Sequence, residues 1–265
     1  MGQRLALGVE YNGAGFHGWQ AQRKPAMPSL QEALQAALSR IANQPVVVHC
    51  AGRTDAGVHA LCQIVHFDAR VERPLKAWHR GTNSHLSDDL CVRWARPVPA
   101  DFHARHSARR RRYRYVIYNS PTRSAVLAKR VTWHVPELDA QLMHRAAQCL
   151  VGTHDFTSYR ATACQSRSPV RDVFSVSVKR QGALLLLDIE ANAFLMHMIR
   201  NIAGVLMAVG SGKQCADWVR QVLETRDRRA AGVTAPPHGL YFLGAGYDAR
   251  FGLPAWVTGP DFSFL

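Results

Sequence analysis

Short segments of alternating apolar residues, separated by turns or single helices, constrain the fold of this chain more than any other feature. Residues 5–11 alternate between apolar and smaller or polar side chains, which is typical of a half-buried strand. Residues 111–118 alternate in the same way, with Tyr113, Tyr115 and Ile117 on one face. Such segments pair most simply with their neighbours along the chain, so we expect antiparallel strands.

The connections between these segments favour an α+β fold. Gln181-Gly182 lies between two apolar segments and predicts a hairpin turn. Ser29 and Glu32 have the spacing of a capping box, at the start of a helix that continues to Ile41. A second, strongly apolar helix is predicted over residues 198–209. The whole pattern predicts a largely antiparallel mixed sheet with helices packed on it.

Further elements follow in the same mixture along the chain. Strands are expected at residues 46–50, 63–68, 90–95, 174–178, 183–191 and 240–247, and helices at residues 74–83, at 142–150 after a capping Asp139, and around Trp218. This succession fits two pseudo-equivalent halves, residues 1–108 and 109–265, that flank a central basic cleft. The first half carries the loop around Asp55, and the second completes the cleft.

The net charge indicates a polyanionic partner. The chain has 33 Lys and Arg against 19 Asp and Glu, a formal net charge of +14. Nucleic acid is the commonest partner of so basic a chain. A merely basic, well-solvated surface is the alternative.

The sequence disfavours a membrane-spanning protein and a secreted protein, because it lacks the segments that each of them needs. No apolar run approaches the roughly 20 residues of a membrane-spanning helix. The N-terminus lacks a basic segment followed by an apolar one, so no secretory signal is expected. We therefore expect a soluble, cytoplasmic protein without a membrane partner.

Several short motifs do not have the context that their usual functions require. Residues 13–18 match the GxGxxG of dinucleotide-binding folds, but Pro25 and Pro28 follow and the helix begins only after Ser29. Residues 210–213 resemble part of a phosphate loop without its first glycine. The 13 histidines include no HExxH or Cys/His cluster, so we predict no metal.

The segment Gly52-Arg53-Thr54-Asp55-Ala56-Gly57-Val58-His59-Ala60 is the best candidate for chemistry. It is a polar turn bracketed by glycines between two apolar strands, and such a turn can hold a carboxylate at the mouth of a cleft. Arg53 stands beside Asp55, and the other neighbours are small. In the alternative interpretation, Asp55 only caps its own backbone.

This nonapeptide resembles the signature of the tRNA pseudouridine synthases that act at positions 38 to 40. The resemblance extends over nearly the whole chain. Its other segments are Tyr11-Asn12-Gly13 through Phe16-His17-Gly18-Trp19-Gln20, Phe102-His103-Ala104-Arg105, Arg112-Tyr113-Arg114-Tyr115, Asp155-Phe156-Thr157-Ser158, Phe194 to Asn201, and Gly239-Leu240-Tyr241. Arg109 and Arg110 receive no role.

The resemblance implies a reaction and a set of site residues. Asp55 would be the nucleophile, with C1′ of the ribose or C6 of the base as its target. Arg200 would pair with Asp55, although it can also be a helix residue that reaches to solvent. Tyr113 would stack on the uracil or act as a base, and its alternative is packing on its strand. Leu240 would line the base pocket or belong to the core, and Arg53 would contact phosphate or replace the extruded base.

The resemblance also implies the partners and the needs of the reaction. The substrate would be the anticodon stem-loop of tRNA at positions 38, 39 and 40, the protein would be a homodimer, and no metal, nucleotide or redox cofactor would be needed. Two other functions stay open on the sequence. One is a non-catalytic RNA-binding protein on the same fold, and the other is a nucleotide-dependent oxidoreductase that uses residues 13–18.

Overall fold

The protein folds into two compact units. The computed structural model describes residues 2–21 and 28–254, and Pro25 lies outside them. Among the described residues, unit 1 contains those from 2 to 109 and from 242 to 254, and unit 2 contains those from 110 to 241. Strand β10 (Leu240–Gly246) starts in unit 2 and ends in unit 1.

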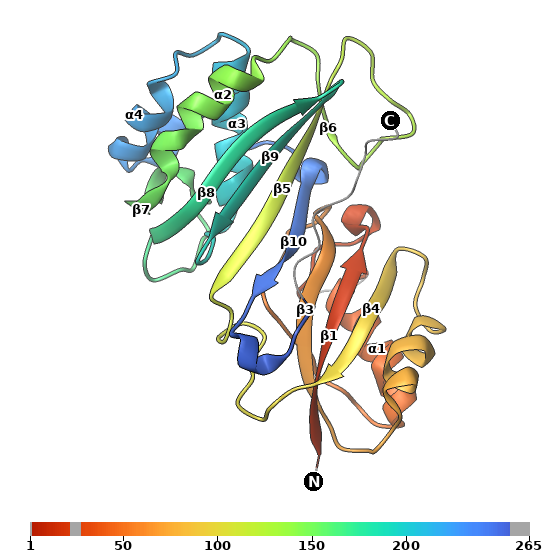
Figure 1. The fold of residues 1–265 in the computed structure, drawn as a ribbon. Helices are drawn as coiled ribbons and strands as arrows, with labels where there is room; N and C mark the ends of the chain where they lie inside the picture. The colour runs from red at the N-terminus through yellow and green to blue at the C-terminus, as the bar shows by residue number, and fades with distance from the viewer. Residues whose placement is uncertain (1, 22–27, 255–265) are drawn as a thin grey trace. The chain divides into compact units, whose positions relative to one another are not determined.

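Unit 1 is built on an antiparallel sheet with the order β4-β1-β3 (Figure 1). The short strand β2 also pairs with β3. Its elements are β1 (Gln3–Tyr11), η1 (Gly13–Gly15), α1 (Leu30–Ala42), β2 (His49–Cys50), β3 (His59–Ala69), η2 (Ala77–Gly81), β4 (Leu90–Pro97) and η7 (Ala249–Phe251). The hairpin between β2 and β3 holds the loop that contains Asp55.

Strand β1 is buried on both of its faces, so the prediction of a half-buried strand is wrong. Leu5 and Leu7 are fully buried, and so is Ala6, which points to the opposite face. The physical reason is that β1 is the inner strand between β3 and β4, and the ring of Trp94 on β4 lies against Gly8 on its second face.

Helix α1 begins and ends as its sequence predicts. Ser29 accepts a hydrogen bond from Glu32 N at 3.2 Å, and the Glu32 carboxylate accepts one from Ser29 N at 3.3 Å, which completes the capping box. The helix ends where Asn43 adopts the left-handed conformation. Leu34 and Leu38 are fully buried, each stabilising the fold by about 2 kcal/mol.

Unit 2 has an antiparallel sheet in the order β5-β9-β8-β7, with the short β6 parallel to β5. Its elements are β5 (Arg110–Asn119), β6 (Thr132–His134), α2 (Ala140–Ala147), η3 (Gln148–Leu150), β7 (Gly152–Asp155), η4 (Thr157–Tyr159), β8 (Val170–Gln181), β9 (Leu184–Ala191), α3 (Met198–Gly210), α4 (Trp218–Thr225), η5 (Arg228–Ala231) and η6 (Pro237–Gly239). Helix α2 contacts β8 and α3, and α3 also contacts β5 and α4.

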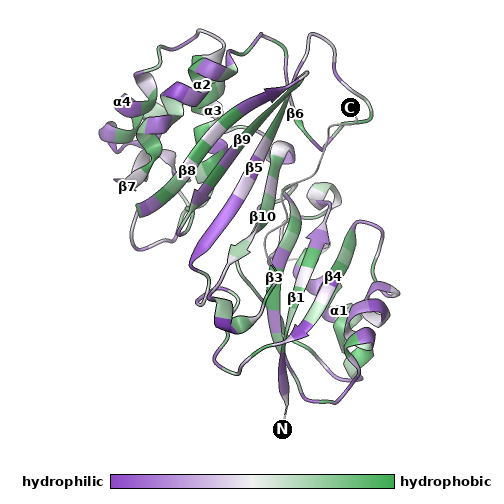
Figure 2. Ribbon diagram, in the orientation of Figure 1, coloured by the Kyte–Doolittle hydropathy of each residue, from purple (hydrophilic) through white to green (hydrophobic). Residues whose placement is uncertain are grey.

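The core of unit 2 lies between α3 and the central strands. Tyr115, Leu187 and Ile189 are fully buried on the sheet, and Ile202 and Leu206 are fully buried on α3. The start of β5 is polar, as its purple colour in Figure 2 shows, because arginines occupy its first three positions. The same strand therefore contributes to the core at one end and to the surface at the other.

Strand β8 contains a β-bulge that the sequence pattern does not reveal. The pairing with β9 shifts between Val173 and Ser175. In the strand predicted at residues 174–178, regular alternation would place Phe174, Val176 and Val178 on one face, but Phe174 is 37% exposed whereas both valines are buried. The extra residue turns the Phe174 side chain away from the core, so that part of the prediction is wrong.

The other differences concern short elements. The strand predicted at residues 46–50 is reduced to β2, because residues 46–48 have no backbone ladder. Strands β6 and β7 were not predicted, since each is at most four residues long. The helix predicted at residues 74–83 is present from residue 75 and contains the π-helical turn η2.

The predicted fold class is confirmed as α+β with a largely antiparallel sheet; only the β5–β6 pair is parallel among the pairings described within the two units. Within the described ranges 2–21 and 28–254, no helix has the length and apolar character that crossing a membrane requires.

Candidate active site

The loop that carries Asp55 is held at both of its ends. Ala51 N donates to Ile64 O at 2.8 Å, so β2 continues its pairing with β3 up to the loop. The fully buried Gln63 donates from Nε2 to Gly52 O at 2.6 Å and accepts from Gly52 N at 3.3 Å. One buried amide therefore fixes both polar groups of Gly52, and the loop leaves the sheet in a set direction.

The middle of the loop is fixed through Thr54, the buried neighbour of Asp55. Its hydroxyl is 2.8 Å from Tyr11 Oη, and its carbonyl accepts from Trp19 N at 3.0 Å. Asp55 O accepts from Val58 N at 3.2 Å. The side chain of Asp55 is half-buried and Arg53 is exposed, so the loop holds a carboxylate at the surface on a rigid base.

Two of the three glycines that match a dinucleotide motif, Gly13 and Gly18, pack against this loop instead. A Cβ on Gly13 would lie 1.9 Å from Val58 O, and one on Gly18 would lie 2.7 Å from Thr54 O. Gly18 also has a φ of +82°, which other residues rarely adopt. Gly15 has open space around it. The backbone of residues 13–18 therefore packs directly on the backbone of residues 54–58.

Tyr113 lies on β5 opposite Ile189 of β9 and is buried. Its ring contacts Phe194 edge to face, with ring centroids 5.1 Å apart. Phe194 is only partly buried and belongs to the segment that leads into α3. Tyr113 is therefore oriented by an aromatic neighbour that sequence reasoning did not single out.

Arg200 lies in the first turn of α3 and is joined to Ala235 at two points. Arg200 Nε donates to Ala235 O at 2.8 Å, and Ala235 N donates to Arg200 O at 3.1 Å. Burial raises the pKa of Tyr115 on β5, and the nearby Arg200 charge acts in the opposite direction. The guanidinium thus lies near β5, the strand of Tyr113.

A buried polar network holds the segment that contacts Arg200. Asn201, which is fully buried, accepts at Oδ1 from Thr234 Oγ1 at 2.7 Å and from Arg228 Nη2 at 3.0 Å. Its Nδ2 donates to Tyr159 O at 2.7 Å. Arg228 also donates to Thr234 Oγ1 at 2.7 Å and to Gly232 O at 2.9 Å. Hydrogen bonds to Asn201 and Arg228 therefore hold residues 232–235 in place.

Leu240 is the first residue of β10 and is buried. It follows η6, and the hydroxyl of its neighbour Tyr241 donates to Arg130 O. Tyr115 donates to Pro236 O at 2.8 Å, just before η6. The segment that leads into Leu240 is thus fixed to β5.

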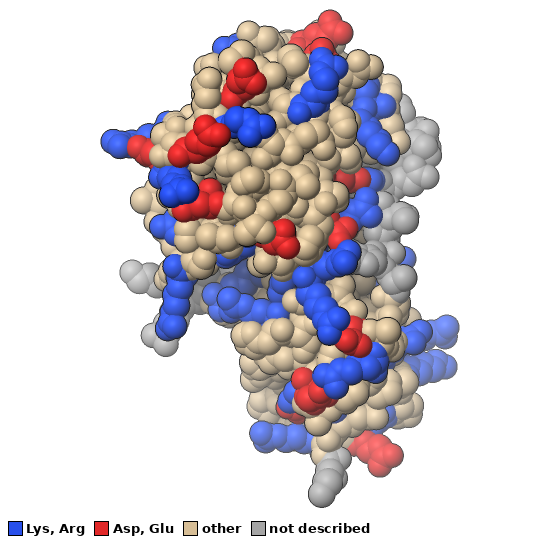
Figure 3. Space-filling view, turned by 60° about the vertical axis from the view of Figure 1, so that its left-hand side comes forward, with Lys and Arg blue, Asp and Glu red and all other residues tan. Residues whose placement is uncertain are grey.

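The arginine-rich start of β5 is largely paired with acidic residues of β9. Arg114 makes a two-point ion pair with Asp188, at 2.7 and 2.8 Å, and Arg112 contacts the same carboxylate at 3.3 Å. Arg110 contacts Glu190 at 3.3 Å. Lys and Arg residues are spread over the face drawn in Figure 3, with Asp and Glu residues among them.

No group of three or more His, Cys, Asp and Glu side chains is arranged to hold a metal ion within residues 2–21 and 28–254. Four histidine rings do cluster in unit 1, but they contact one another through their ring faces and edges.

Known proteins share this sequence over nearly its whole length. A model of the family described as tRNA pseudouridine synthase matches residues 8–107 and 146–248. The chain belongs to the tRNA pseudouridine synthase family. Two relatives are named tRNA pseudouridine synthase A. The one from Pseudomonas aeruginosa is 57% identical over 98% of this chain and 90% of that protein. The one from Photobacterium profundum is 54% identical over 98% of each chain.

As a tRNA pseudouridine synthase, the chain is an enzyme of the isomerase class. Arg53, Asp55, Arg200 and Leu240 lie in the segments that the family model matches, whereas Tyr113 lies between them. Arg53 and Asp55 share one loop of unit 1, and Tyr113, Arg200 and Leu240 belong to unit 2. The pairing of Asp55 with Arg200 stays a prediction.

Supporting residues of this synthase were missed on the sequence. Asn201 could have been found, because a carboxamide within an apolar helix needs a buried partner. Arg228 could not, since it is one of three arginines between Arg226 and Arg229 and nothing in the sequence distinguishes it.

Proposed function

We propose that the protein isomerises uridine to pseudouridine in the anticodon stem-loop of tRNA, at positions 38, 39 and 40, with Asp55 as the nucleophile. The loop that carries Asp55 is the observation on which this proposal rests. Gln63 and Tyr11 hold that loop rigidly, and the carboxylate is only half-buried. A fixed, accessible carboxylate is what nucleophilic attack on a bound nucleotide requires.

The isomerisation breaks the bond between C1′ and N1 and forms one between C1′ and C5. Asp55 attacks either C1′ of the ribose or C6 of the base, and both routes need the ionised carboxylate. The bond it forms is broken again, because C5 displaces the carboxylate from C1′ or, on the other route, elimination releases it from C6. After C5 has bonded to C1′, it loses its proton and N1 gains one, so the product has the same atoms as the substrate. No oxidant, reductant or nucleotide enters this balance.

Arg200 is proposed to pair with Asp55 and keep it ionised. Support comes from the two hydrogen bonds between Arg200 and Ala235, which orient the guanidinium, and from the network of Asn201 and Arg228 beneath them. A guanidinium that is held in one direction can stabilise a carboxylate without losing side-chain entropy on substrate binding.

The other site residues are proposed to act on the extruded base. Tyr113, with its ring held by Phe194, stacks on the uracil or removes the C5 proton. Leu240 lines the base pocket. Arg53, exposed beside the carboxylate, contacts phosphate or takes the place of the base, whose extrusion costs a few kcal/mol. We also propose a cytoplasmic homodimer.

Pseudouridine formation on defined tRNA transcripts tests this proposal. Five transcripts are compared: one with uridines at positions 38, 39 and 40, three that keep a single one of them, and one with cytidine at all three positions. After incubation without added cofactor, digestion to nucleosides and chromatography measure pseudouridine. We expect product from each single-uridine transcript and none from a transcript with cytidine at all three positions.

Asp55→Asn should give no product above background while still binding tRNA. The matched control is Asp88→Asn, which changes an exposed aspartate elsewhere in unit 1 and should retain activity. Product from Asp55→Asn would exclude it as the nucleophile. Product from the all-cytidine transcript would place the target uridine elsewhere in tRNA.

A further inference from the structure

The turn at residues 103–107 is closed by its own polar groups. His103 Nδ1 accepts from Arg105 N at 3.1 Å and from His106 N at 3.2 Å. His103 N donates to Ser107 Oγ at 2.9 Å, and Ser107 N donates to His103 O at 2.9 Å. The imidazole therefore closes this turn by accepting backbone hydrogen bonds, as an aspartate side chain does in an Asx turn.

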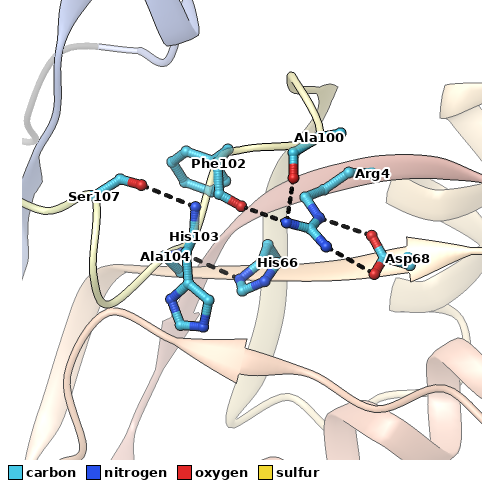
Figure 4. Close-up of polar contacts among 8 residues, drawn as sticks. All are labelled: Arg4, His66, Asp68, Ala100, Phe102, His103, Ala104 and Ser107. Atoms are coloured by element: carbon cyan, nitrogen blue, oxygen red, sulfur yellow. Dashed lines mark hydrogen bonds and ion pairs between the residues drawn. The ribbon is translucent and has the colours of Figure 1, made fainter.

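The same turn is anchored to the strands below it (Figure 4). Arg4 Nη1 donates to Phe102 O at 2.9 Å, and Ala104 N donates to His66 Nδ1 at 3.1 Å. Tyr247 Oη donates to Ala104 O at 2.6 Å, and Phe102 is fully buried. These contacts fix the backbone before Arg105, and the bonds of His106 N and Ser107 N to His103 fix the backbone after it.

Four histidine rings fill the space beside the turn. The rings of His66 and His103 have centroids 4.5 Å apart, and His49 stacks on His66 at 5.1 Å. The ring of His106 lies 4.3 Å from that of His103. Because backbone N–H groups donate to Nδ1 of His66 and His103, the proton of each ring is on Nε2 and both rings are neutral. Arg105 therefore supplies the permanent positive charge of the turn.

Arg105 is exposed. Burial raises the pKa of the Cys50 thiol to about 12, and the charges of Arg53 and Arg105 both oppose that rise. Both guanidinium groups are thus within electrostatic reach of one thiol, on the last residue of β2.

We propose that Arg105 binds a phosphate of the substrate tRNA and that His103 is its positioning residue. This inference rests on the proposed function, because it assigns a docking point for the same RNA. A rigid turn with an exposed arginine suits this role, since guanidinium binds phosphate through two donors and little order is lost on binding.

The phosphate belongs to the backbone away from the target nucleotide. His49 pairs with His66, which is seven residues along β3 from His59. At the rise of an extended strand, this corresponds to about 23 Å between the cluster and the start of β3 near Asp55. Arg105 belongs to the turn that rests on His66, so we assign it to a phosphate that positions the RNA and not to the reacting base.

Salt dependence of tRNA binding tests the charge contact. The affinity of Arg105→Gln, Arg105→Lys and the wild type for a tRNA transcript is measured between low and moderate salt. We expect Arg105→Gln to bind roughly three- to fivefold more weakly and to reduce the slope of log K against log salt by about 0.7 to 0.9. Arg105→Lys keeps the slope, because it keeps the charge.

The matched control is Arg80→Gln. Arg80 is exposed in unit 1 on the helix beside β4, at the opposite edge of the sheet order from β2. It should leave slope and affinity unchanged. An unchanged slope in Arg105→Gln, or an equal loss of slope in Arg80→Gln, would overturn the proposal.

His103 is tested by two substitutions of different chemistry. His103→Leu removes the acceptor for Arg105 N and His106 N, and should reduce the slope as Arg105→Gln does. His103→Asn restores an acceptor and should bind as the wild type does. If His103→Leu folds and binds like the wild type, or if His103→Asn loses the slope, the positioning role is wrong.

Steady-state kinetics distinguish a failure of this proposal from a failure of the proposed function. In Arg105→Gln the loss should appear in KM for tRNA and not in kcat. A wild-type protein that forms no pseudouridine would refute the proposed function while leaving the binding measurement intact. A loss in kcat alone would refute the role of Arg105 in docking.

Discussion

Arg200 Nε donates a hydrogen bond of 2.8 Å to the carbonyl oxygen of Ala235, 35 positions further along the chain. The orientation of this guanidinium thus depends on the loop of residues 232–235. That loop is fixed by Thr234 and Arg228 through Asn201.

Thr234→Val should slow pseudouridine formation roughly tenfold, or about 1.4 kcal/mol in the activation free energy. The substitution keeps the shape of the side chain and removes its bonds to Asn201 and Arg228, so the carbonyl of Ala235 is no longer held. Single-turnover rates with saturating enzyme measure the effect. Thr225→Val, on the exposed end of α4, is the control and should react at the wild-type rate. A lower melting temperature with an unchanged rate would show that Thr234 matters for stability alone.

Gly13→Ala and Gly15→Ala should differ sharply although they are two positions apart. A Cβ at Gly13 meets Val58 O at 1.9 Å, so we expect a loss of about 1 to 3 kcal/mol in the free energy of unfolding and a displaced Asp55 loop. A Cβ at Gly15 meets nothing within 4 Å, and its effect should stay within about 0.5 kcal/mol. Urea unfolding and pseudouridine formation are measured on both. Equal effects would contradict the packing of residue 13 on the loop.

Protonation of His66 should contribute to acid destabilisation. Burial lowers its pKa from 6.5 to about 4, with smaller effects from His103, His49 and Arg4 that outweigh the opposing charge of Asp68. Between these two values the unfolded chain binds more protons than the folded one, so the free energy of unfolding falls as the pH drops from 6.5 towards 4.

His66→Asn isolates this contribution, because asparagine accepts from Ala104 N but does not titrate. Between about pH 7 and about pH 5, the wild type should lose about 2 kcal/mol more than His66→Asn. Urea midpoints at the two pH values give the comparison. Equal losses in both proteins would show that His66 is not the titrating group.

Phe194→Leu should lower the rate of pseudouridine formation roughly three- to tenfold, because the edge-to-face contact with Tyr113 contributes about 0.5 to 1.5 kcal/mol. Phe174→Leu, at an exposed aromatic of the same unit, should leave the rate unchanged. A wild-type rate in Phe194→Leu would mean that Tyr113 needs no aromatic support.

Local sequence signals predicted the long elements of this fold well. The capping box of Ser29 and Glu32, the Asp139 cap and the Gln181-Gly182 turn all appear where their chemistry places them. These signals work because each depends on hydrogen bonds or backbone angles within a few residues. The burial of both faces of β1 depends on strands far away in sequence, so alternation alone could not predict it.

The candidate site was predictable only in part, for a similar reason. The Asp55 loop could be predicted, because its residues, Gly52 and Arg53 among them, are consecutive in the sequence and form a recognisable motif. Its support by Gln63 and Tyr11, and that of Arg200 by Ala235 and Arg228, comes from side chains that meet only after folding.

The bulge in β8 contributes to the surface of the sheet and not to the packing of the core. Without Phe174, the sequence Val173-Ser175-Val176-Ser177-Val178 would alternate without interruption, and the three valines would still face the core. Core packing therefore does not require the extra residue. What it adds is an aromatic ring at the surface, over which the Arg110 guanidinium lies 5.1 Å from the ring centroid. Deletion of this one residue would give a more regular ladder and remove the platform for that arginine, so the irregularity serves the surface of the sheet and not its interior.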